Sequence, residues 1–453
     1  MLPKSANEDC FDKKAVQTAE TLEVEDDCNT SVCGRCSSAD GCNTSSSGEC
    51  SHAEGCGSKA LGDCSHAEGS NTRALENNSH AEGCSTRAIG NCSHAEGSNT
   101  IAYSDSSHTE GLNTKTRGNY AHGEGNGNEA NGESSHAQGV GTKAEGYASS
   151  SEGGYTTVRG SYAHAEGYST TVNGYYSHAE GVYTTATGNY SHAEGYSCLT
   201  EGYGSHAEGY YTSARAPFSH SEGYYTDTKL NTGSHIMGIY GEADTPYSWF
   251  LGGGTSNLKA LAAKILYTGD GYIRNAWHAG GSGYAEVYPG LGGQTIEPGY
   301  FVTLEGEFIR KAKDSDKFVL GVTSVNPAFV ASSSELNLGS NFLTNAWNQT
   351  LYEDNLVPEK TDTEGNVTEP AHVIKQPMQK LQSSVIAQAA ASCQDSISSL
   401  VTLLGQVLVL DDGTCEPNGY CWPNKDGIAT TSSFGYRVMK RISDNQVLIF
   451  FRG

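Results

Sequence analysis

A histidine and a glutamate recur two positions apart through the first half of the chain. They belong to a 14-residue unit, SHAEG-xxTxAxGxx, with 14 in-phase copies that begin between Ser37 and Ser219. Histidine fills its position in 12 copies, and only Ser38 and Ser150 replace it. Glutamate also recurs in 12 copies, with Asp40 and Gln138 as the exceptions. Solvent alone does not select one pair so faithfully, so we expect this face to be packed.

The chemistry that such pairs offer is charge-assisted hydrogen bonding. We predict that they point at a threefold axis, where each chain's glutamate meets a neighbour's histidine, because buried carboxylates need partners. An exposed polar ladder is one alternative, and rings of three histidines binding Zn or Fe are another. Local metal-binding spacings are missing, so we expect no metal and no cofactor. The predicted axis ladder contains His52, Glu54, His66, Glu68, His80, Glu82, His94, Glu96, His178, Glu180, His192, Glu194, His206 and Glu208.

Cysteines occupy fixed places in the same repeat. Equivalent positions further along hold tyrosines, so both residue types are expected to pack near the corners of the coils. Cys28, Cys33 and Cys36 resemble a zinc cluster, but their phase favours packing as thiols. The tyrosines from Tyr155 to Tyr225 fit either corner packing or stacking on sugars. The cysteines before the SHAEG segment are Cys36, Cys50, Cys64 and Cys92, and those after it are Cys42, Cys56 and Cys84.

The elements that position these side chains follow from the period. Each copy reads as two short strands, Ser-His-Ala-Glu and Thr-x-Ala, separated by turns. Ser and Ala then share one face of the first strand, and His and Glu share the other. The fifth position is glycine in every copy, from Gly41 to Gly223, which suits a turn with positive φ. Stacking 14 coils at roughly 4.8 Å gives a rod of about 65–70 Å.

Composition excludes several functions. The formal charge of −24 opposes binding to nucleic acid, whose phosphates need a basic surface. With 56 glycines and 36 % hydrophobic residues, the chain is poorly suited to one large globular core. The first residues contain no apolar signal segment, and no apolar run of about 20 residues follows. We therefore expect no membrane insertion, and a protein assembled in the cytoplasm and carried outside on a particle.

The repeat resembles the head repeats of trimeric autotransporter adhesins, in its period, its glycine placement and its Thr-x-Ala-x-Gly half. That family forms left-handed parallel β-rolls that trimerise. The resemblance covers about 200 residues and departs where the family has apolar residues and this chain has His and Glu. It implies an all-β fold, with a trimeric left-handed parallel β-roll solenoid.

The SHAEG pattern ends at Ser234. We expect the aromatic residues of the next 20 positions to cap the roll, followed by a hairpin with its turn at Gly269–Gly271. The last part of the chain contains several strand-like stretches and predicts a mostly β domain. An irregular insertion at about 331–397 includes a segment, 378–394, with a helical pattern. The predicted strand-like stretches are 299–306, 307–312, 317–325, 406–413, 435–442 and 446–451.

A second resemblance rests on four blocks of this last region. GYAEVY, GYFVTLEGEFIRKA, LGVTSVNPAFV and the block from Leu408 to Ile442 are similar to the intramolecular-chaperone autoproteolytic domain of phage neck appendages. That family is classed with glutamic endopeptidases, and its chaperone promotes trimerisation of a fibre before it is cut away. The resemblance implies a chaperone-type C-terminal domain that can cleave itself.

Carried over residue by residue, the family's Asp-Tyr-Ala-Glu motif falls on residues 283–286. The resemblance implies that Glu286 is the catalytic carboxylate and that the cut lies between Ser282 and Gly283, with Ser282 as a candidate nucleophile through an N-to-O acyl shift. Gly283 replaces the aspartate of the motif, so one carboxylate is missing. Glu286 as a salt-bridged strand residue is the alternative. His278 is a candidate base or a solvated loop residue.

Four parts are expected: an attachment or disordered segment, 1–25; the β-roll, 26–240; a neck, 241–282; and the autoproteolytic domain, 283–453. Cys415 and Cys421 are expected to pack or to form a hairpin disulfide. The function that we expect is a tail-fibre or appendage protein of a phage or prophage, located in the virion as a homotrimer. Its partner outside is a host glycan or surface receptor. The alternative is a bacterial surface binding protein with an uncleaved trimerisation domain.

Overall fold

The computed structural model describes residues 11–12, 29–331, 343, 345, 351–361, 367–369, 371–378 and 398–452. The chain divides into two compact units, Met1–Asn275 with Lys360–Glu369, and Ala276–Glu359 with Pro370–Gly453. Regular structure in the described ranges is β-strand, apart from one 3-10 turn, η1, at Leu291–Gly293. No helix in these ranges is long and apolar enough to cross a membrane. The all-β fold class is thus confirmed.

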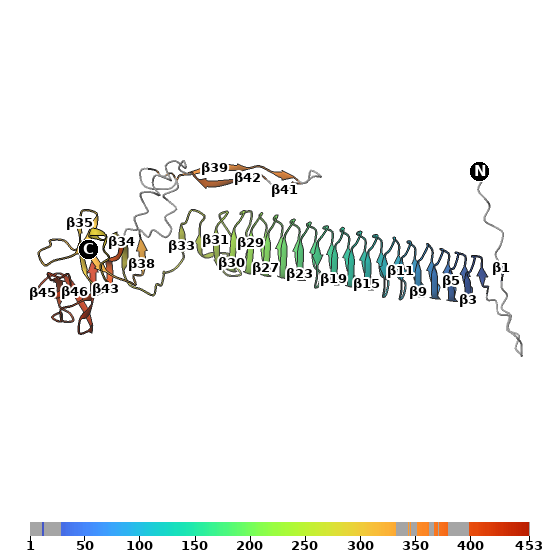
Figure 1. Ribbon diagram of the computed structural model, residues 1–453, viewed down its shortest axis with the longest axis horizontal. Helices are drawn as coiled ribbons and strands as arrows, with labels where there is room; N and C mark the ends of the chain where they lie inside the picture. The colour runs from blue at the N-terminus through green and yellow to red at the C-terminus, as the bar shows by residue number, and fades with distance from the viewer. Residues whose placement is uncertain are drawn as a thin grey trace. The chain divides into compact units, whose positions relative to one another are not determined.

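The repeats form a parallel β-solenoid, in which each 14-residue copy adds one rung to each of two sheets (Figure 1). One sheet is built of two-residue strands: β2 Ser31–Val32, β4 Ser45–Ser46, β6 Lys59–Ala60, β8 Arg73–Ala74, β10 Arg87–Ala88, β12 Ile101–Ala102, β14 Lys115–Thr116, β16 Glu129–Ala130, β18 Lys143–Ala144, β20 Thr157–Val158, β22 Thr171–Val172, β24 Thr185–Ala186, β26 Leu199–Thr200 and β28 Ser213–Ala214. A short strand, β1 Phe11–Asp12, pairs antiparallel with β2.

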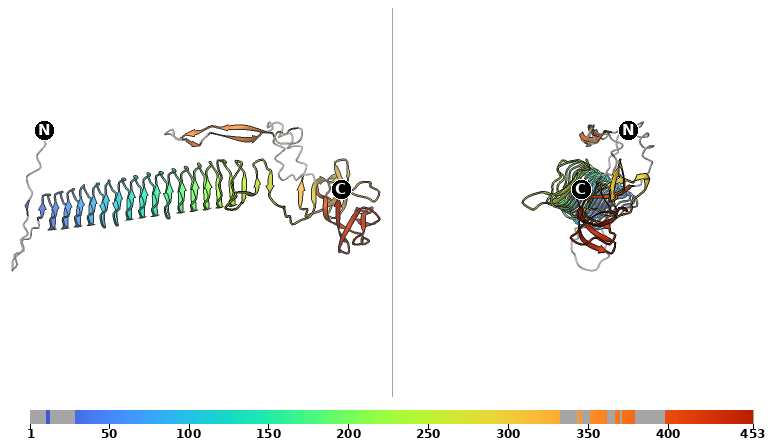
Figure 2. Two further views of the ribbon diagram at one scale, coloured as in Figure 1. Left: turned by 180° about the vertical axis from the view of Figure 1, so that it is seen from behind. Right: turned by 90° about the vertical axis from the view of Figure 1, so that its left-hand side faces the viewer.

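The other sheet carries the His-Ala-Glu segments in register, as His52 opposite His66 shows. Its strands are β3 Ser38–Cys42, β5 His52–Cys56, β7 His66–Ser70, β9 His80–Cys84, β11 His94–Ala95, β13 His108–Thr109, β15 His122–Asn126, β17 His136–Val140, β19 Ser150–Gly154, β21 His164–Ala165, β23 His178–Val182, β25 His192–Tyr196, β27 His206–Tyr210 and β29 His220–Tyr224. The end-on view in Figure 2 shows the rungs stacked behind one another.

The core between the two sheets is narrow and made of small residues. Ala53 and Ala60 are fully buried in one coil, and the same positions are buried along the solenoid. Ser51 and Thr72 are buried with them, whereas Lys59 and Arg73 face solvent. The predicted assignment of faces is confirmed: alternation puts Ser, Ala and Thr inside and leaves His and Glu outside.

The repeated glycine sits within the strand rather than at a turn. Gly55 has a φ of +105°, and a Cβ there would lie 2.1 Å from the carbonyl oxygen of Gly69 in the next coil. Positive φ was predicted, but the close approach of successive backbones is the stronger reason for glycine.

The solenoid continues beyond Ser234, contrary to the prediction that its period stops there. Strands β30 His235–Ile239 and β31 Trp249–Gly253 add two parallel rungs, with Trp249 opposite His235. Ile236 and Phe250 fill the core positions that alanine holds elsewhere. The predicted hairpin follows as β32 Leu261–Ile265 and β33 Gly271–Ile273, which pair antiparallel.

The second unit is a mainly antiparallel β domain, and each predicted strand stretch overlaps a strand. Phe301, Val409, Ile449 and Phe451 are buried in its core. The predicted helix at 378–394 lies outside the described residues. The strands are β34 Tyr284–Pro289, β35 Phe301–Glu305, β36 Phe308–Lys311, β37 Gly321–Thr323, β38 Phe329–Ala331, β39 Tyr352–Val357, β42 His372–Pro377, β43 Ser398–Leu410, β44 Tyr420–Pro423, β45 Ala429–Ser432, β46 Tyr436–Ser443 and β47 Gln446–Arg452. In the first unit, β40 Lys360–Thr361 pairs with β41 Val367–Glu369.

The cysteines follow the prediction only in part. Cys33 and Cys42 each take part in a disulfide, so the expectation that Cys33 packs as a thiol is wrong. Cys28 lies outside the described residues. Cys415 and Cys421 are free and fully buried, which selects packing over a hairpin disulfide.

Candidate functional site

Glu286 lies in the middle of β34, a strand held on both sides. It is opposite Val401 of β43 in an antiparallel pair and opposite Ala331 of β38 in a parallel pair. Ala285 is fully buried on the inner face, so Tyr284, Glu286 and Tyr288 alternate onto the other face. The backbone therefore fixes where the carboxylate of Glu286 points.

Two phenols hold the carboxylate of Glu286. Tyr284 Oη donates to Oε1 at 2.7 Å, and Tyr288 Oη donates to Oε2 at 2.9 Å. The bond to the carboxylate raises the pKa of Tyr284, and burial followed by the same kind of bond raises the pKa of Tyr288. Both phenols thus remain protonated donors. Within the described part of the chain Glu286 forms no ion pair, and the two tyrosines take the place of the salt-bridge partner in the alternative interpretation.

Sequence reasoning missed these two tyrosines as site residues. The signal was present, because Tyr-x-Glu-x-Tyr in a strand places all three side chains on one face. Their role became apparent only when the two hydrogen bonds were in view.

Gly283, at the motif position of the missing aspartate, has a backbone that excludes a side chain. Its φ is +90°, and a Cβ there would lie 2.9 Å from both the carbonyl oxygen of Leu404 and Cγ2 of Thr402. On the facing strand, a Cβ on Gly405 would lie 2.7 Å from Gly283 Cα. The two glycines form a close backbone contact that an aspartate at position 283 would disrupt.

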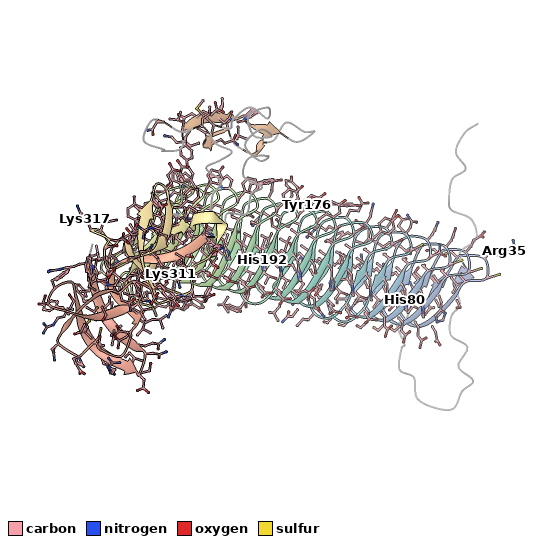
Figure 3. All side chains as sticks on the ribbon, turned by 60° about the vertical axis from the view of Figure 1, so that its left-hand side comes forward. Arg35, His80, Tyr176, His192, Lys311 and Lys317 are labelled. Atoms are coloured by element: carbon pink, nitrogen blue, oxygen red, sulfur yellow. The ribbon has the colours of Figure 1, made fainter. Side chains whose placement is uncertain are left out.

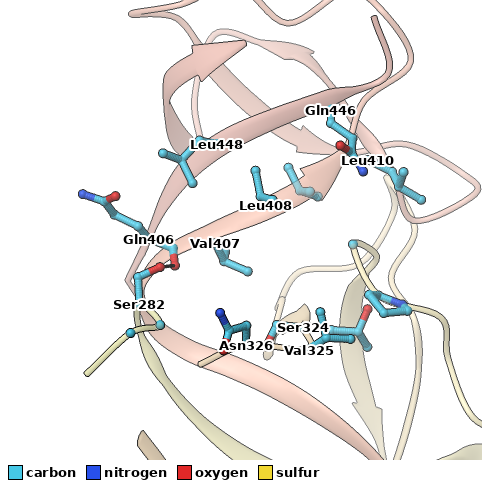
Figure 4. A pocket seen from close by; sticks show the side chains of 16 residues that line it. Ser282, Ser324, Val325, Asn326, Gln406, Val407, Leu408, Leu410, Gln446 and Leu448 are labelled. Carbon is cyan, nitrogen blue, oxygen red and sulfur yellow. Dashed lines mark hydrogen bonds between the residues drawn. The ribbon is translucent and has the colours of Figure 1, made fainter. Parts of the chain in front are cut away.

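Ser282 lies on the rim of a pocket of about 520 Å³ (Figure 4). Its Oγ donates to the carbonyl oxygen of Gln406 at 2.9 Å. Gly280, Gly281 and Asn326 line the same pocket, and a Cβ on Gly281 would lie 2.4 Å from the carbonyl oxygen of Asn326. The predicted scissile segment therefore lies at the edge of a cavity, and its serine is hydrogen-bonded to β43.

Within one chain, Glu286 does not reach the predicted cut. At about 3.3 Å per residue, the three steps from Gly283 to Glu286 separate their Cα atoms by about 10 Å. The side chain of Glu286 stands across the strand rather than along it. His278 is exposed, and no contact joins it to Ser282 among the described residues.

The two roles predicted for Ser282 are chemically incompatible. In an N-to-O acyl shift, a serine hydroxyl attacks the carbonyl before it, which would break the Gly281–Ser282 bond. Cleavage between Ser282 and Gly283 instead uses the carbonyl of Ser282 itself. The shift is therefore discarded, and the position of the cut stays a prediction.

The His and Glu ladder runs along one face of the solenoid, and Figure 3 shows His80 and His192 on it. The rings of His80 and His94 stack with centroids 4.6 Å apart and an interplanar angle of 2°. Stacks run from His66 to His136 and from His164 to His235. In Figure 3, Tyr176 lies at another edge of the solenoid.

The predicted pairs join different chains, and within one chain His52 and Glu54 form a hydrogen bond. His52 lies 3.4 Å from Glu54, but His80 and Glu82 are 4.0 Å apart. Nε2 of His80 and of ten other ladder histidines is shielded from solvent and has no hydrogen-bond partner in the described part of the chain. Burial and then neighbouring rings lower the pKa of His94 and of His178. The rings of His94 and His178 are therefore neutral at neutral pH.

The ladder also contains groups of three side chains whose possible metal-ligand atoms lie close together. In one group, the ligand atoms of His80, Glu82 and His94 lie within 4.8 Å of one another. Two ligands on one Zn²⁺, at about 2.1 Å each, are at most about 4.2 Å apart. A group whose ligand atoms are more than about 4.2 Å apart would have to contract before it bound a metal. The expectation of no metal stays a prediction.

Sequence comparisons connect the later part of the chain, from the last rungs of the solenoid onward, to known proteins. Residues 235–446 match the family Peptidase_G2, IMC autoproteolytic cleavage domain. The pre-neck appendage protein of Bacillus phage B103 is 30 % identical over 207 residues, which cover 46 % of this chain and 22 % of that protein. The pre-neck appendage protein of Bacillus phage phi29 is 39 % identical over 80 residues, which cover 18 % of this chain and 9 % of that protein. The chain thus spans less than a quarter of each of these relatives.

A solved structure, the pre-mature bacteriophage phi29 gene product 12, matches 92 % of this chain and 58 % of its own, with 16 % identity and a TM-score of 0.46. The match to residues 235–446 includes the whole segment that contains Ser282, Gly283 and Glu286. The resemblance that the sequence implied is confirmed: the chain combines a β-solenoid with a region similar to the IMC autoproteolytic cleavage domain.

Proposed function

We propose that this chain is a structural component of a phage appendage, with a C-terminal region that promotes assembly and then cleaves the Ser282–Gly283 bond. The observation that carries the proposal is the position of Glu286. It lies in the region that matches an autoproteolytic family, and two phenols orient its carboxylate on the strand that begins next to the predicted cut.

The chemistry that fits these groups is hydrolysis. Glu286 takes a proton from a water molecule, and the water oxygen attacks the carbonyl carbon of Ser282. The bond from that carbon to the nitrogen of Gly283 then breaks, and the proton passes to this nitrogen. A carboxylate at Ser282 and an amino group at Gly283 result.

The active arrangement is an assembly of several copies, because Glu286 of one chain lies about 10 Å from its own scissile bond. We propose a homotrimer in which the carboxylate of one copy serves the Ser282–Gly283 bond of another. The shielded Nε2 atoms of the ladder support association, since a neighbour's carboxylates would supply acceptors.

The last two rungs, β30 and β31, present apolar side chains on the face that carries the His and Glu ladder. Met237 and Leu251 replace glutamate there, and Trp249 replaces histidine. Trp249 is 58 % exposed and Leu251 is 42 % exposed in the single chain. Burial of these side chains against other copies would favour a trimer.

Intact mass spectrometry of the expressed full chain tests the proposal. We expect a 282-residue and a 171-residue product, since 453 − 282 = 171. Glu286→Gln should remain intact, whereas Glu307→Gln, an exposed glutamate between β35 and β36, should be cut like the wild type. A folded wild-type assembly that stays in one piece would contradict the cleavage.

One observation favours the alternative, a binding protein whose C-terminal domain stays attached. The backbone at Gly283 leaves no space for the second carboxylate of the family's motif. The test above separates the two functions, because an uncut trimer supports the alternative.

A further inference from the structure

Three cysteines stack in register at one corner of the first coils. Cys36, Cys50 and Cys64 are 14 residues apart, and all three are exposed. Their φ values are 56°, 54° and 54°, so each occupies the same left-handed corner position. Arg35, which precedes Cys36, marks this end of the solenoid in Figure 3.

Backbone hydrogen bonds fix the coils to one another at this corner. Cys50 N donates to the carbonyl oxygen of Arg35 at 2.8 Å, and Cys64 N donates to that of Glu49 at 2.7 Å. Neighbouring rungs of a sheet are about 4.8 Å apart, which lies in the range of Cα separations that a disulfide spans. Cys36 and Cys64 are two rungs apart, at about 9.6 Å, which is too far.

We propose that Cys50 forms a disulfide with Cys36 under oxidising conditions, and that this bond latches the first coils of the solenoid together. Of the two neighbours of Cys50, Cys36 is the one that lies between Cys33 and Cys42 in the sequence. Disulfides already occur at this end of the solenoid, because Cys33 and Cys42 each take part in one.

The reaction is a thiol–disulfide exchange with a small disulfide such as oxidised glutathione. The thiolate of Cys50 attacks one sulfur of the small disulfide and expels one thiolate. The thiolate of Cys36 then attacks the sulfur of Cys50 and expels the second. One protein disulfide forms, the small disulfide is reduced by two electrons, and two molecules of its thiol leave with the two protons.

The chain supplies a matched control at the same corner. Cys92 has a φ of 54° and is exposed, but its neighbours in the adjacent coils are Asn78 and Ser106. Cys92 therefore resembles the other three in backbone and exposure, and lacks a thiol one rung away.

Differential alkylation of the full chain, with one reagent before reduction and a second after it, tests the latch at each cysteine. After treatment with oxidised glutathione, peptide masses should show Cys36 and Cys50 at least tenfold more protected than Cys92. In Cys50→Ser, protection of Cys36 should fall to the level of Cys92, and Cys64→Ser should leave the Cys36–Cys50 pair intact. Equal labelling of Cys36, Cys50 and Cys92 in the wild type would overturn the proposal, as would chains linked to one another through these cysteines.

Discussion

The hydroxyl of Tyr284 and the carboxylate of Glu286 are joined by a 2.7 Å hydrogen bond on the outer face of β34. Removing this donor, or that of Tyr288, should let the carboxylate turn away from its catalytic position. A hydrogen bond to a charged group contributes about 1.5–3 kcal/mol, so Tyr284→Phe and Tyr288→Phe should each slow cleavage by about 10–100-fold. The rate of product formation by intact mass measures the effect.

The matched control is Tyr420→Phe, since Tyr420 lies in the same unit and contacts Arg437 rather than Glu286. Its cleavage rate should equal that of the wild type, and all three variants should remain folded. If Tyr284→Phe and Tyr288→Phe are both cut at the wild-type rate, the phenols have no positioning role.

Cleavage between copies predicts complementation. A Glu286→Ala chain that carries a tag should stay intact alone, because no copy offers the carboxylate. When it is co-expressed with untagged wild type, its Ser282–Gly283 bond should be cut in mixed assemblies. Intact mass of the tagged chain, purified through its tag, measures the cut fraction. A tagged variant that stays whole beside cleaved wild-type chains would place Glu286 and the scissile bond in one and the same chain.

The solenoid was largely predictable, because its period repeats at short range. The alternation Ser-His-Ala-Glu assigned Ser51 and Ala53 to the inside, and their burial agrees. The two further rungs, β30 and β31, were not predicted because Ile236 and Phe250 replace alanine in the core. The sequence repeat therefore ends, although the parallel stacking of rungs continues.

The site was predictable only through the resemblance that points to Glu286. The contact of Gly283 with Gly405 joins positions 122 residues apart (405 − 283), and no local sequence pattern predicts it. The pocket beside Ser282 likewise brings together Asn326, from the loop between β37 and β38, and Gln406 of β43. Sequence spacing defines neighbours along a strand, whereas sheet pairing defines neighbours across it.

The stacked histidines predict a loss of stability in acid. Burial, followed by the neighbouring rings of His235 and His206, lowers the pKa of His220 from 6.5 to about 4. The unfolded chain therefore binds a proton between pH 6.5 and 4 that the folded chain does not bind. Stability is complete above pH 6.5 and falls as the pH drops through this window, by on the order of 2 kcal/mol for His220 after allowance for its exposure.

Thermal unfolding at pH 7 and at pH 4.5, followed by circular dichroism, measures this loss. Glu208 lies 3.9 Å from Nε2 of His220 and opposes the effect, but burial and the two rings dominate. His220→Gln should reduce the difference between the two pH values. A solenoid that becomes more stable in acid would mean that carboxylates pair with protonated rings.

The space available for a Cβ differs between the repeated glycine, such as Gly139, and Gly127 in the neighbouring coil, so an alanine should destabilise the solenoid by different amounts at the two positions. At Gly139, φ is +116° and a Cβ would lie 2.0 Å from the carbonyl oxygen of Gly153. At Gly127, φ is +70° and no atom lies within 4 Å of the position of a Cβ. Gly127→Ala should cost about 1–2 kcal/mol for its left-handed backbone, and Gly139→Ala should add about 1–3 kcal/mol for the clash. Because the clash involves backbone rather than a side chain, neighbouring coils cannot relieve it by a rotamer change. Chemical denaturation of the two variants measures the difference, and equal losses would show that close packing of successive backbones does not select the glycine.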